Sequence, residues 1–393
     1  MNNIPLFKVY MSPEAVKASA EVLQSGYIGQ GSKVEEFENS LKVYLKNDRV
    51  LTVNSATSAE HLALLLLKKP AVFNNVIDGA GYSMNNWPGL EPGDEVLSTP
   101  LTCTASNFPT ILAGYKLKWV DVDPINLNMD LDDLARKITP KTKIIMLVFW
   151  GGMPVDMQRL KKIQDTAYNM YGFKPAIIID GAHSLGATYQ DTPINNFGHI
   201  TTYSFQAIKH ITSVDGGALI LPHAELYKRG KLLRWYGIDR EGDRKDFRCE
   251  SNIDEVGTKW HMNDVNAVIG DMNLKYGRHV LEAHINNAAH YNKTLANIPG
   301  VTLLTPTPHA KSAYWIYTIK VENRDGFMQK MAENNITVSR VHERNDKHTA
   351  VREFLTQLPT LDTVSAQMIC IPVGWWVTEE QREHIVKTIK SGW

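Results

Sequence analysis

Cysteine, net charge and long apolar runs are all scarce in this sequence. Its three cysteines, Cys103, Cys249 and Cys370, are widely spaced and odd in number, which argues against a disulfide framework and a zinc site. Because 42 basic residues balance 42 acidic ones, the chain lacks the overall attraction for phosphate that nucleic-acid and anionic-membrane binders show. No stretch approaches the roughly 18 apolar residues of a membrane span, and the N-terminus has no export-signal pattern. We therefore expect a cytoplasmic protein that binds no metal, nucleic acid or membrane.

The length of 393 residues exceeds what a single hydrophobic core usually holds, so two domains are predicted. Residues 1–280 are expected to form a large α/β domain with a mostly parallel sheet. Residues 281–393 change to a long helix, strands over 301–304, 313–321 and 337–341, and further helices. That order is typical of a smaller C-terminal α+β domain.

Two reactive side chains follow consecutive predicted strands. Residues 176–179 are apolar without alternation, which predicts a strand buried on both faces with Asp180 at its carboxyl end. Open α/β sheets bind ligands at that edge. After the next strand, 201–205, Lys209 lies in a turn between isoleucines, where losing its proton costs little, as a Schiff-base amine requires. A carboxylate can pair with a pyridinium nitrogen; the alternative is a helix cap at Asp180 and a surface amine at Lys209.

A run of small hydroxyl residues connects the predicted strand 50–53 to the predicted helix 59–67. Here Thr57 and Ser58 can offer hydroxyl and backbone N–H donors to a phosphate. The same pattern also serves as a simple helix cap, so the residues alone leave both interpretations open.

Two further motifs do not support the functions that they first suggest. The glycines of residues 27–31 follow no strand and lack a third glycine, which argues against a dinucleotide fingerprint. The three aspartates of residues 119–130 do not have EF-hand spacing, so this segment is predicted to be a strand end, a turn and a helix cap.

Six ordered blocks make the chain resemble the DegT/DnrJ/EryC1/StrS family of sugar aminotransferases. These are pyridoxal-phosphate (PLP) enzymes of fold type I, the aspartate aminotransferase fold, and the resemblance runs from about Leu6 to the C-terminus. The blocks are SGYIGQGSKVEEFE (25–38), NSATSAEHLAL (54–64), GDEVLSTPLTCTASN (93–107), DGAHSLGA (180–187), SFQAIKHITSVDGG (204–217) and KWHMNDVNAVIG (259–270).

The resemblance implies that Lys209 binds the PLP aldehyde and later carries the proton of the reaction, while Asp180 keeps the ring nitrogen protonated. It implies that His183 packs against the cofactor. The implied phosphate contacts are Thr57, Ser58 and Ser204. Lys259 stands where the family commonly has an asparagine that reaches the phosphate of the neighbouring subunit, which implies a homodimer with active sites at the subunit interface.

Three segments depart from the family pattern. Cys103 occupies a position that usually carries an aromatic residue stacked on the pyridine ring, so either the alignment slips by a residue or another side chain, such as Trp150, covers that face. Residues 68–92 form an insertion that we place near a subunit contact or the pocket mouth. The charged cluster 342–348 either lines the substrate site or is surface charge.

The implied reaction moves an amino group, typically from glutamate, to a nucleotide-linked keto sugar, most often a 4-keto-6-deoxyhexose, for amino-sugar and surface-polysaccharide biosynthesis. Relatives that carry histidine at the lysine position dehydrate the sugar instead. Because Lys209 holds that position and His210 follows it, transamination is favoured. A PLP-dependent sugar dehydratase, an aminotransferase that acts on a keto-cyclitol or other small ketone, and a non-catalytic PLP-binding sensor remain alternatives.

Overall fold

The large domain is built on a seven-stranded sheet, which confirms the predicted α/β class. The computed structural model describes residues 2–71, 87–242, 246, 249–250 and 252–393. The strands lie in the order β1-β9-β8-β5-β4-β2-β3. β9 is antiparallel to both of its neighbours, whereas β8, β5, β4, β2 and β3 form a continuous parallel set. The strands are β1 Val50–Val53, β2 Glu95–Ser98, β3 Lys116–Trp119, β4 Thr142–Val148, β5 Ala176–Asp180, β8 Ile200–Ser204 and β9 Gly217–Ile220.

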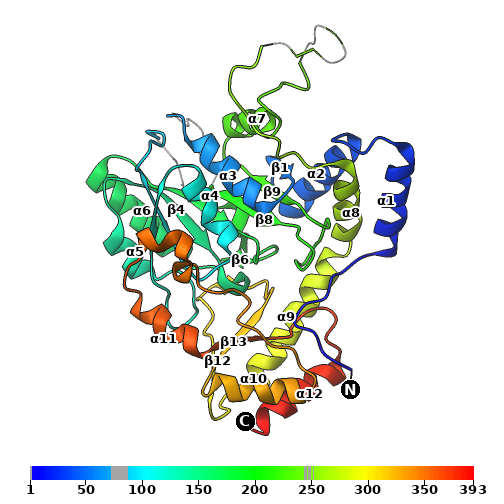
Figure 1. Cartoon of the computed structure of the whole chain (residues 1–393), viewed down its shortest axis with the longest axis vertical. Coiled ribbons are helices and arrows are strands. Elements are labelled where there is room, and N and C mark those ends of the chain that lie inside the picture. The colour runs from blue at the N-terminus through cyan, green and yellow to red at the C-terminus, as the bar shows by residue number, and fades with distance from the viewer. Residues whose placement is uncertain (1, 72–86, 243–245, 247–248, 251) are drawn as a thin grey trace.

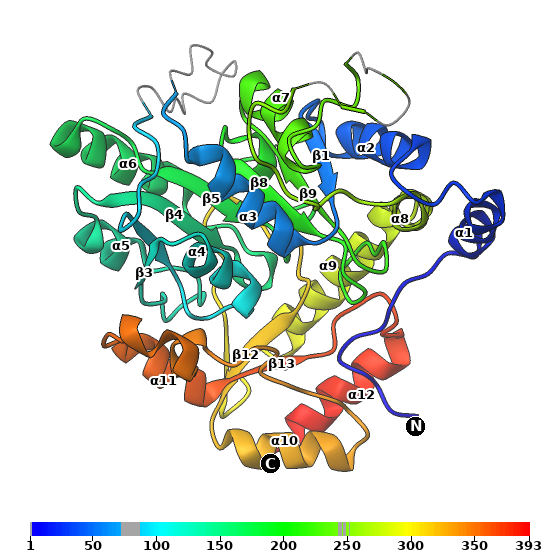
Figure 2. The ribbon, with the colours of Figure 1, turned by 45° about the horizontal axis from the view of Figure 1, so that its top comes forward.

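Helices cover both faces of this sheet, so the domain has three layers (Figure 2). One face packs against α3 and α7, and the other against α5, α6, α2 and α8. Strand β5 shows why both faces are covered: Ile178 belongs to the core on the α3 side, and Ile177 and Ile179 belong to the core on the α6 side. The helices are α1 Pro13–Ser25, α2 Ser32–Leu45, α3 Ala56–Leu67, α4 Phe108–Leu112, α5 Leu131–Lys137, α6 Met157–Tyr171, α7 Ala224–Leu233 and α8 Asp264–Leu274.

The smaller α+β domain contains the antiparallel sheet β10-β12-β13. Helix α9 runs from the large domain into this one, and both chain ends lie at this smaller domain, near α12 (Figure 1). The N-terminal segment joins its core, since Ile4 is buried there and pairs with Ile336. The elements are α9 Gly277–Thr294, β10 Val301–Leu303, β12 Tyr317–Val321, α10 Arg324–Glu333, α11 Pro359–Gln367, β13 Met368–Ile371 and α12 Glu379–Lys390. The exact boundary, expected between residues 280 and 281, stays a proposal.

Two strand predictions in this domain were wrong in detail. Residues 337–341 form no strand, because this segment makes only isolated bridges, Ile336 to Ile4 and Ser339 to Cys370. The strand beside β12 is instead β13. The strand expected from residue 313 begins only at Tyr317, since the preceding residues bond to the loop that follows β4: the N–H groups of Ala313 and Trp315 donate to the carbonyls of Gly152 and Gly151 at 3.1 and 3.0 Å.

A third, short sheet ties the two parts of the chain together. Strand β11 (Ala310–Lys311) pairs with β6 (Thr188–Tyr189), which pairs with β7 (Thr192–Pro193). Among the described residues, no helix has the length and apolarity needed to cross a membrane.

The insertion is anchored at both ends. Residues 72–86 lie outside the described part of the chain. The expectation that the insertion 68–92 lies near a subunit contact or the pocket mouth concerns mostly these residues. Trp87 is buried, and its indole N–H donates to the carbonyl of Leu67 at 2.8 Å. Ala71 and Trp87 also exchange backbone hydrogen bonds, so the two ends of the insertion lie side by side at the end of α3.

Candidate active site

The predicted site residues on the sheet gather at one edge. Asp180 ends β5 and lies opposite Thr202 in β8. Two residues further, Ser204 lies opposite Gly217, and Gly217 lies opposite Val53 at the end of β1. The chain continues from β1 directly into α3, so this edge brings together a carboxylate, a hydroxyl and a helix N-terminus.

Two hydrogen bonds hold the buried carboxylate of Asp180. The hydroxyl of Ser106 donates to one oxygen at 2.6 Å, and the backbone N–H of Ala182 donates to the other at 2.9 Å. The Ser106 hydroxyl also lies 2.7 Å from that of Thr102. Donors of this kind stabilise the ionised form of a carboxyl group. Ser106 was not singled out from the sequence, because the two residues are 74 positions apart.

The amine of Lys209 lies in a largely desolvated position. Its Nζ is 3.4 Å from the centre of the Trp315 ring. Burial lowers the pKa of Lys209 to about 8, although the nearby Asp180 and Cys103 oppose that shift. A lysine with such a pKa is neutral in a useful fraction of molecules near neutral pH, as a nucleophilic amine requires.

Three aromatic rings line the same region. The rings of His183 and Trp315 stack at 4.0 Å with an interplanar angle of 25°, and those of His183 and His342 are parallel at 5.9 Å. Burial first, and then the charge of Lys209, lower the pKa of His183 well below its ordinary value, so the ring is neutral. Burial likewise lowers the pKa of His342 to about 4. No local sequence pattern points to Trp315, which comes from the segment before β12.

At the start of α3, one residue caps the helix and another is a candidate phosphate ligand. Ser55 is the cap, because its hydroxyl accepts the N–H of Ser58 at 3.1 Å. Thr57 is exposed and Ser58 is half-buried. Gly217 lies so close to this turn that a Cβ there would come within 2.5 Å of the backbone nitrogen of Ala56. Only glycine allows that approach, which brings β9 against the helix N-terminus.

The sequence model of the DegT/DnrJ/EryC1/StrS aminotransferase family matches residues 10–390. The chain belongs to this family. It is therefore an aminotransferase, and its cofactor is pyridoxal phosphate.

Solved structures and characterised relatives agree with the family assignment. The crystal structure of AtS13 from Actinomadura melliaura is 46% identical over 100% of both chains, with a TM-score of 0.92. The structure of the sugar aminotransferase CalS13 from Micromonospora echinospora is 41% identical, covers 99% of this chain and 100% of that one, and has a TM-score of 0.90. UDP-4-amino-4-deoxy-L-arabinose–oxoglutarate aminotransferase from Shewanella sediminis (strain HAW-EB3) is 29% identical over 345 residues, 85% of this chain and 81% of that protein. This DegT-family member is a sugar aminotransferase.

The residues at the sheet edge fit the cofactor chemically. The α3 N-terminus, with the exposed hydroxyl of Thr57, suits a phosphate. The carboxyl group of Asp180 suits a protonated ring nitrogen, and the partly neutral Lys209 suits an aldehyde. The buried Nδ1 of His183 has no hydrogen-bond partner among the described residues, as expected of a ring beside a ligand site.

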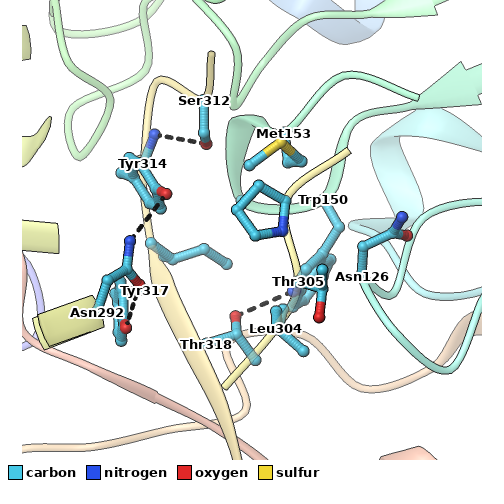
Figure 3. A pocket seen from close by; sticks show the side chains of 13 residues that line it. Asn126, Trp150, Met153, Asn292, Leu304, Thr305, Ser312, Tyr314, Tyr317 and Thr318 are labelled. Carbon is cyan, nitrogen blue, oxygen red and sulfur yellow. Dashed lines mark hydrogen bonds between the residues drawn. The ribbon is translucent and has the colours of Figure 1, made fainter. Parts of the chain in front are cut away.

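Cys103 and Trp150 both lie beside this DegT-family site. Cys103 is half-buried at the start of a short 3-10 turn (Thr104–Ser106), near enough to Lys209 to influence its pKa. Strand β4 ends before Trp150, which opens another 3-10 turn and meets His183 edge-on at 6.0 Å. Its indole N–H donates to Thr318 at 3.0 Å, inside a pocket that also contains Asn292 and Tyr314 (Figure 3). The pocket lining includes neither Lys209 nor Asp180.

In the cluster 342–348, one residue lies at the site and others make supporting contacts behind it. His342 faces His183, as described above. Arg344 is buried and makes a two-pronged ion pair with Asp346, with both distances 2.7 Å. The side chain of Asn345 donates to the carbonyl of Thr102 at 2.8 Å, beside the turn that carries Ser106.

Lys259 is exposed on the segment between α7 and α8. It pairs with Trp235, and the carbonyl of the next residue, Trp260, accepts the N–H of Asn54 at 2.7 Å. The segment that carries Lys259 therefore passes directly beside the N-terminus of α3.

Proposed function

We propose that this sugar aminotransferase transfers an amino group from glutamate to the ketone of a nucleotide-linked 4-keto-6-deoxyhexose, in amino-sugar and surface-polysaccharide biosynthesis. The observation that carries the proposal is the pairing of a low-pKa amine, Lys209, with a buried and doubly hydrogen-bonded carboxylate, Asp180, at one sheet edge. The Shewanella relative is named for oxoglutarate and for a sugar aminated at C4, which supports glutamate as donor and a 4-keto acceptor.

Each residue has a distinct task in the proposed reaction. Pyridoxal phosphate, when bound, supplies an electron sink for the reacting carbon. Asp180 would keep the proton on the ring nitrogen, which that sink requires. Lys209 would hold the aldehyde, and its neutral Nζ, once free, would take up and return the proton of the transfer. His183 would pack against the ring, while Thr57, Ser58 and Ser204 would bind the phosphate.

A homodimer with active sites at the subunit interface completes the proposal. Large apolar side chains are exposed near the segment that carries Lys259: Val256 is 86% exposed and Tyr27 is 85% exposed. Exposed apolar side chains next to Lys259 are compatible with a subunit contact there. In this arrangement the exposed Lys259 would reach the phosphate of the neighbouring subunit, where a cation suits a dianionic phosphate. We place the enzyme in the cytoplasm.

Single-turnover absorbance tests the proposal. Purified enzyme loaded with PLP should show a band that glutamate converts to that of the amine form of the cofactor, and a suitable sugar ketone should reverse the change. A panel of UDP- and dTDP-linked 4-keto hexoses and pentoses, with a keto-cyclitol included, identifies the acceptor. Lys209→Ala should abolish both changes. If glutamate and every sugar ketone leave the spectrum unaltered, the enzyme is not a glutamate-dependent sugar aminotransferase.

A further inference from the structure

Helix α3 carries a buried acid that the reaction described above does not use. Glu60 is 1% exposed. Its neighbours on the helix, Ala59, Leu62 and Ala63, belong to the core between α3 and the sheet. Within the described residues, Oε2 of Glu60 has no hydrogen-bond partner. A buried polar group without a partner costs stability, so its presence here calls for a function.

Strand geometry places Glu60 opposite Asp180. Ile178 packs in the same core as the inner face of α3, and alternate side chains of a strand point to the same face. Asp180, two residues later, therefore also faces α3. The charges that act on Glu60 are those of Asp180 and Cys103, both negative when ionised.

In a buried site, two carboxyl groups that act on each other are not both ionised readily, because like charges disfavour each other. Asp180 is the hydrogen-bond acceptor of the pair, because the Ser106 hydroxyl and the Ala182 N–H already donate to its two oxygens. Glu60 keeps its proton, and burial together with the charge of Asp180 raises its pKa well above the ordinary value.

We propose that Glu60 is a positioning residue: as a neutral acid it donates a hydrogen bond to the Asp180 carboxylate from the helix side, while Ser106 holds that carboxylate from the 3-10 turn. The pair would fix the carboxylate in the orientation that the ring nitrogen of the cofactor needs. This inference rests on the role proposed for Asp180, but not on the sugar substrate or the amino donor.

The chain offers a matched control for the protonation state. Glu38 is also a buried glutamate on a helix, but it forms an ion pair with Arg234 and accepts hydrogen bonds from the N–H and hydroxyl of Thr52. In infrared difference spectra of the apoprotein, E60Q should remove a carboxylic-acid C=O band, and E38Q should remove only a carboxylate band. E38Q should lower Tm by several degrees because it breaks a buried pair. E60Q should change Tm much less.

Titration of the apoprotein with PLP tests the positioning role. Because a glutamine amide still donates, E60Q should keep its PLP affinity within roughly threefold of the wild type. E60L, which cannot donate, should lose about tenfold. Glu60→Met replaces E60L if that variant does not fold. A carboxylate band lost in E60Q would overturn the protonation state, and wild-type PLP affinity in E60L would overturn the positioning role. Neither the infrared spectra nor the PLP titration uses a sugar. Both tests therefore stay valid if the proposed sugar amination is wrong.

Discussion

The amine of Lys209 lies 3.4 Å from the centre of the indole ring of Trp315. The indole N–H in turn donates to the carbonyl of Ile208, the residue before the lysine, at 2.9 Å. The segment that carries Trp315 is held by the loop after β4 and by His210, whose ring nitrogen lies 3.0 Å from the carbonyl of Ala313. The apolar surroundings of the reactive amine are therefore supplied partly by the small domain.

Two substitutions of Trp315 should distinguish the contribution of its packing to stability from that of its hydrogen bond. We expect W315A to reduce the free energy of unfolding by about 3–5 kcal/mol, since a large buried ring is removed. W315F keeps a ring but leaves the carbonyl of Ile208 without its donor, which should cost about 1–2 kcal/mol. Denaturant unfolding measures both values.

Trp393→Phe is the control for W315F, because the indole N–H of the half-buried Trp393 also donates to a backbone carbonyl, that of Glu322, but this hydrogen bond is exposed to solvent. Its cost should be within about 0.5 kcal/mol of zero. Equal losses in W315F and Trp393→Phe would contradict the importance of the Ile208 contact.

The stability of the apoenzyme should depend on pH through Lys209. Its pKa is lowered from 10.5 to about 8 by burial. Between these two values the unfolded chain holds a proton that the folded chain has lost, so stability increases as pH rises through this window. Below about 8 both states are protonated, and the folded protein bears the full cost of the buried charge, on the order of 2 kcal/mol after allowance for partial exposure.

Urea unfolding of apo wild type and Lys209→Met from pH 7.5 to 10.5 measures this effect. The difference in stability between the two proteins should be largest at the acidic end and shrink toward the alkaline end. The rate at which the apoenzyme takes up PLP should rise with pH over the same range, because only the neutral amine reacts. Parallel stability curves for the two proteins would show that the Lys209 pKa is ordinary.

Ser55 and Thr57 should respond to substitution in opposite ways. Ser55→Ala removes the cap of α3 and should lower the stability of the apoenzyme by about 1 kcal/mol. Thr57→Ala changes an exposed hydroxyl and should leave that stability unchanged, but it should weaken PLP binding severalfold. Thermal unfolding of the apoenzyme and titration with PLP distinguish the two roles. An unchanged PLP affinity in Thr57→Ala would exclude Thr57 from the phosphate site.

Mixed dimers should reveal whether Lys259 acts across the subunit interface. Lys259→Met should weaken PLP binding, and Lys209→Ala should be inactive. If Lys259 reaches the neighbouring subunit, a dimer of one K209A and one K259M chain contains one site with both defects and one intact site. Activity at limiting PLP should then recover on mixing to a fraction of the wild-type value. No recovery on mixing would mean that Lys259 serves its own subunit or does not bind phosphate.

Local patterns in the sequence determined the class of fold and the main reactive pair. The unbroken apolar run before Asp180 indicated a strand covered on both faces, and the structure has cores on both sides of β5. Ser12, Pro13 and Gly26 are local signals of the same kind: the Ser12 hydroxyl caps α1, Pro13 opens it, and Gly26 at φ 74° ends it. Such features depend on residues adjacent in the chain, because capping, turn formation and periodicity act over a few positions.

Only the tertiary structure decided which distant side chains surround that pair. Trp315 stands in a segment, 313–321, that was predicted to be a strand, but bonds to Gly151 and Gly152 turn it toward Lys209. Ser106 and Glu60 have no local pattern that connects them to Asp180. Their roles arise because sheet order and helix packing bring separate segments to one edge, and packing over such sequence distances depends on the whole core rather than on neighbouring residues.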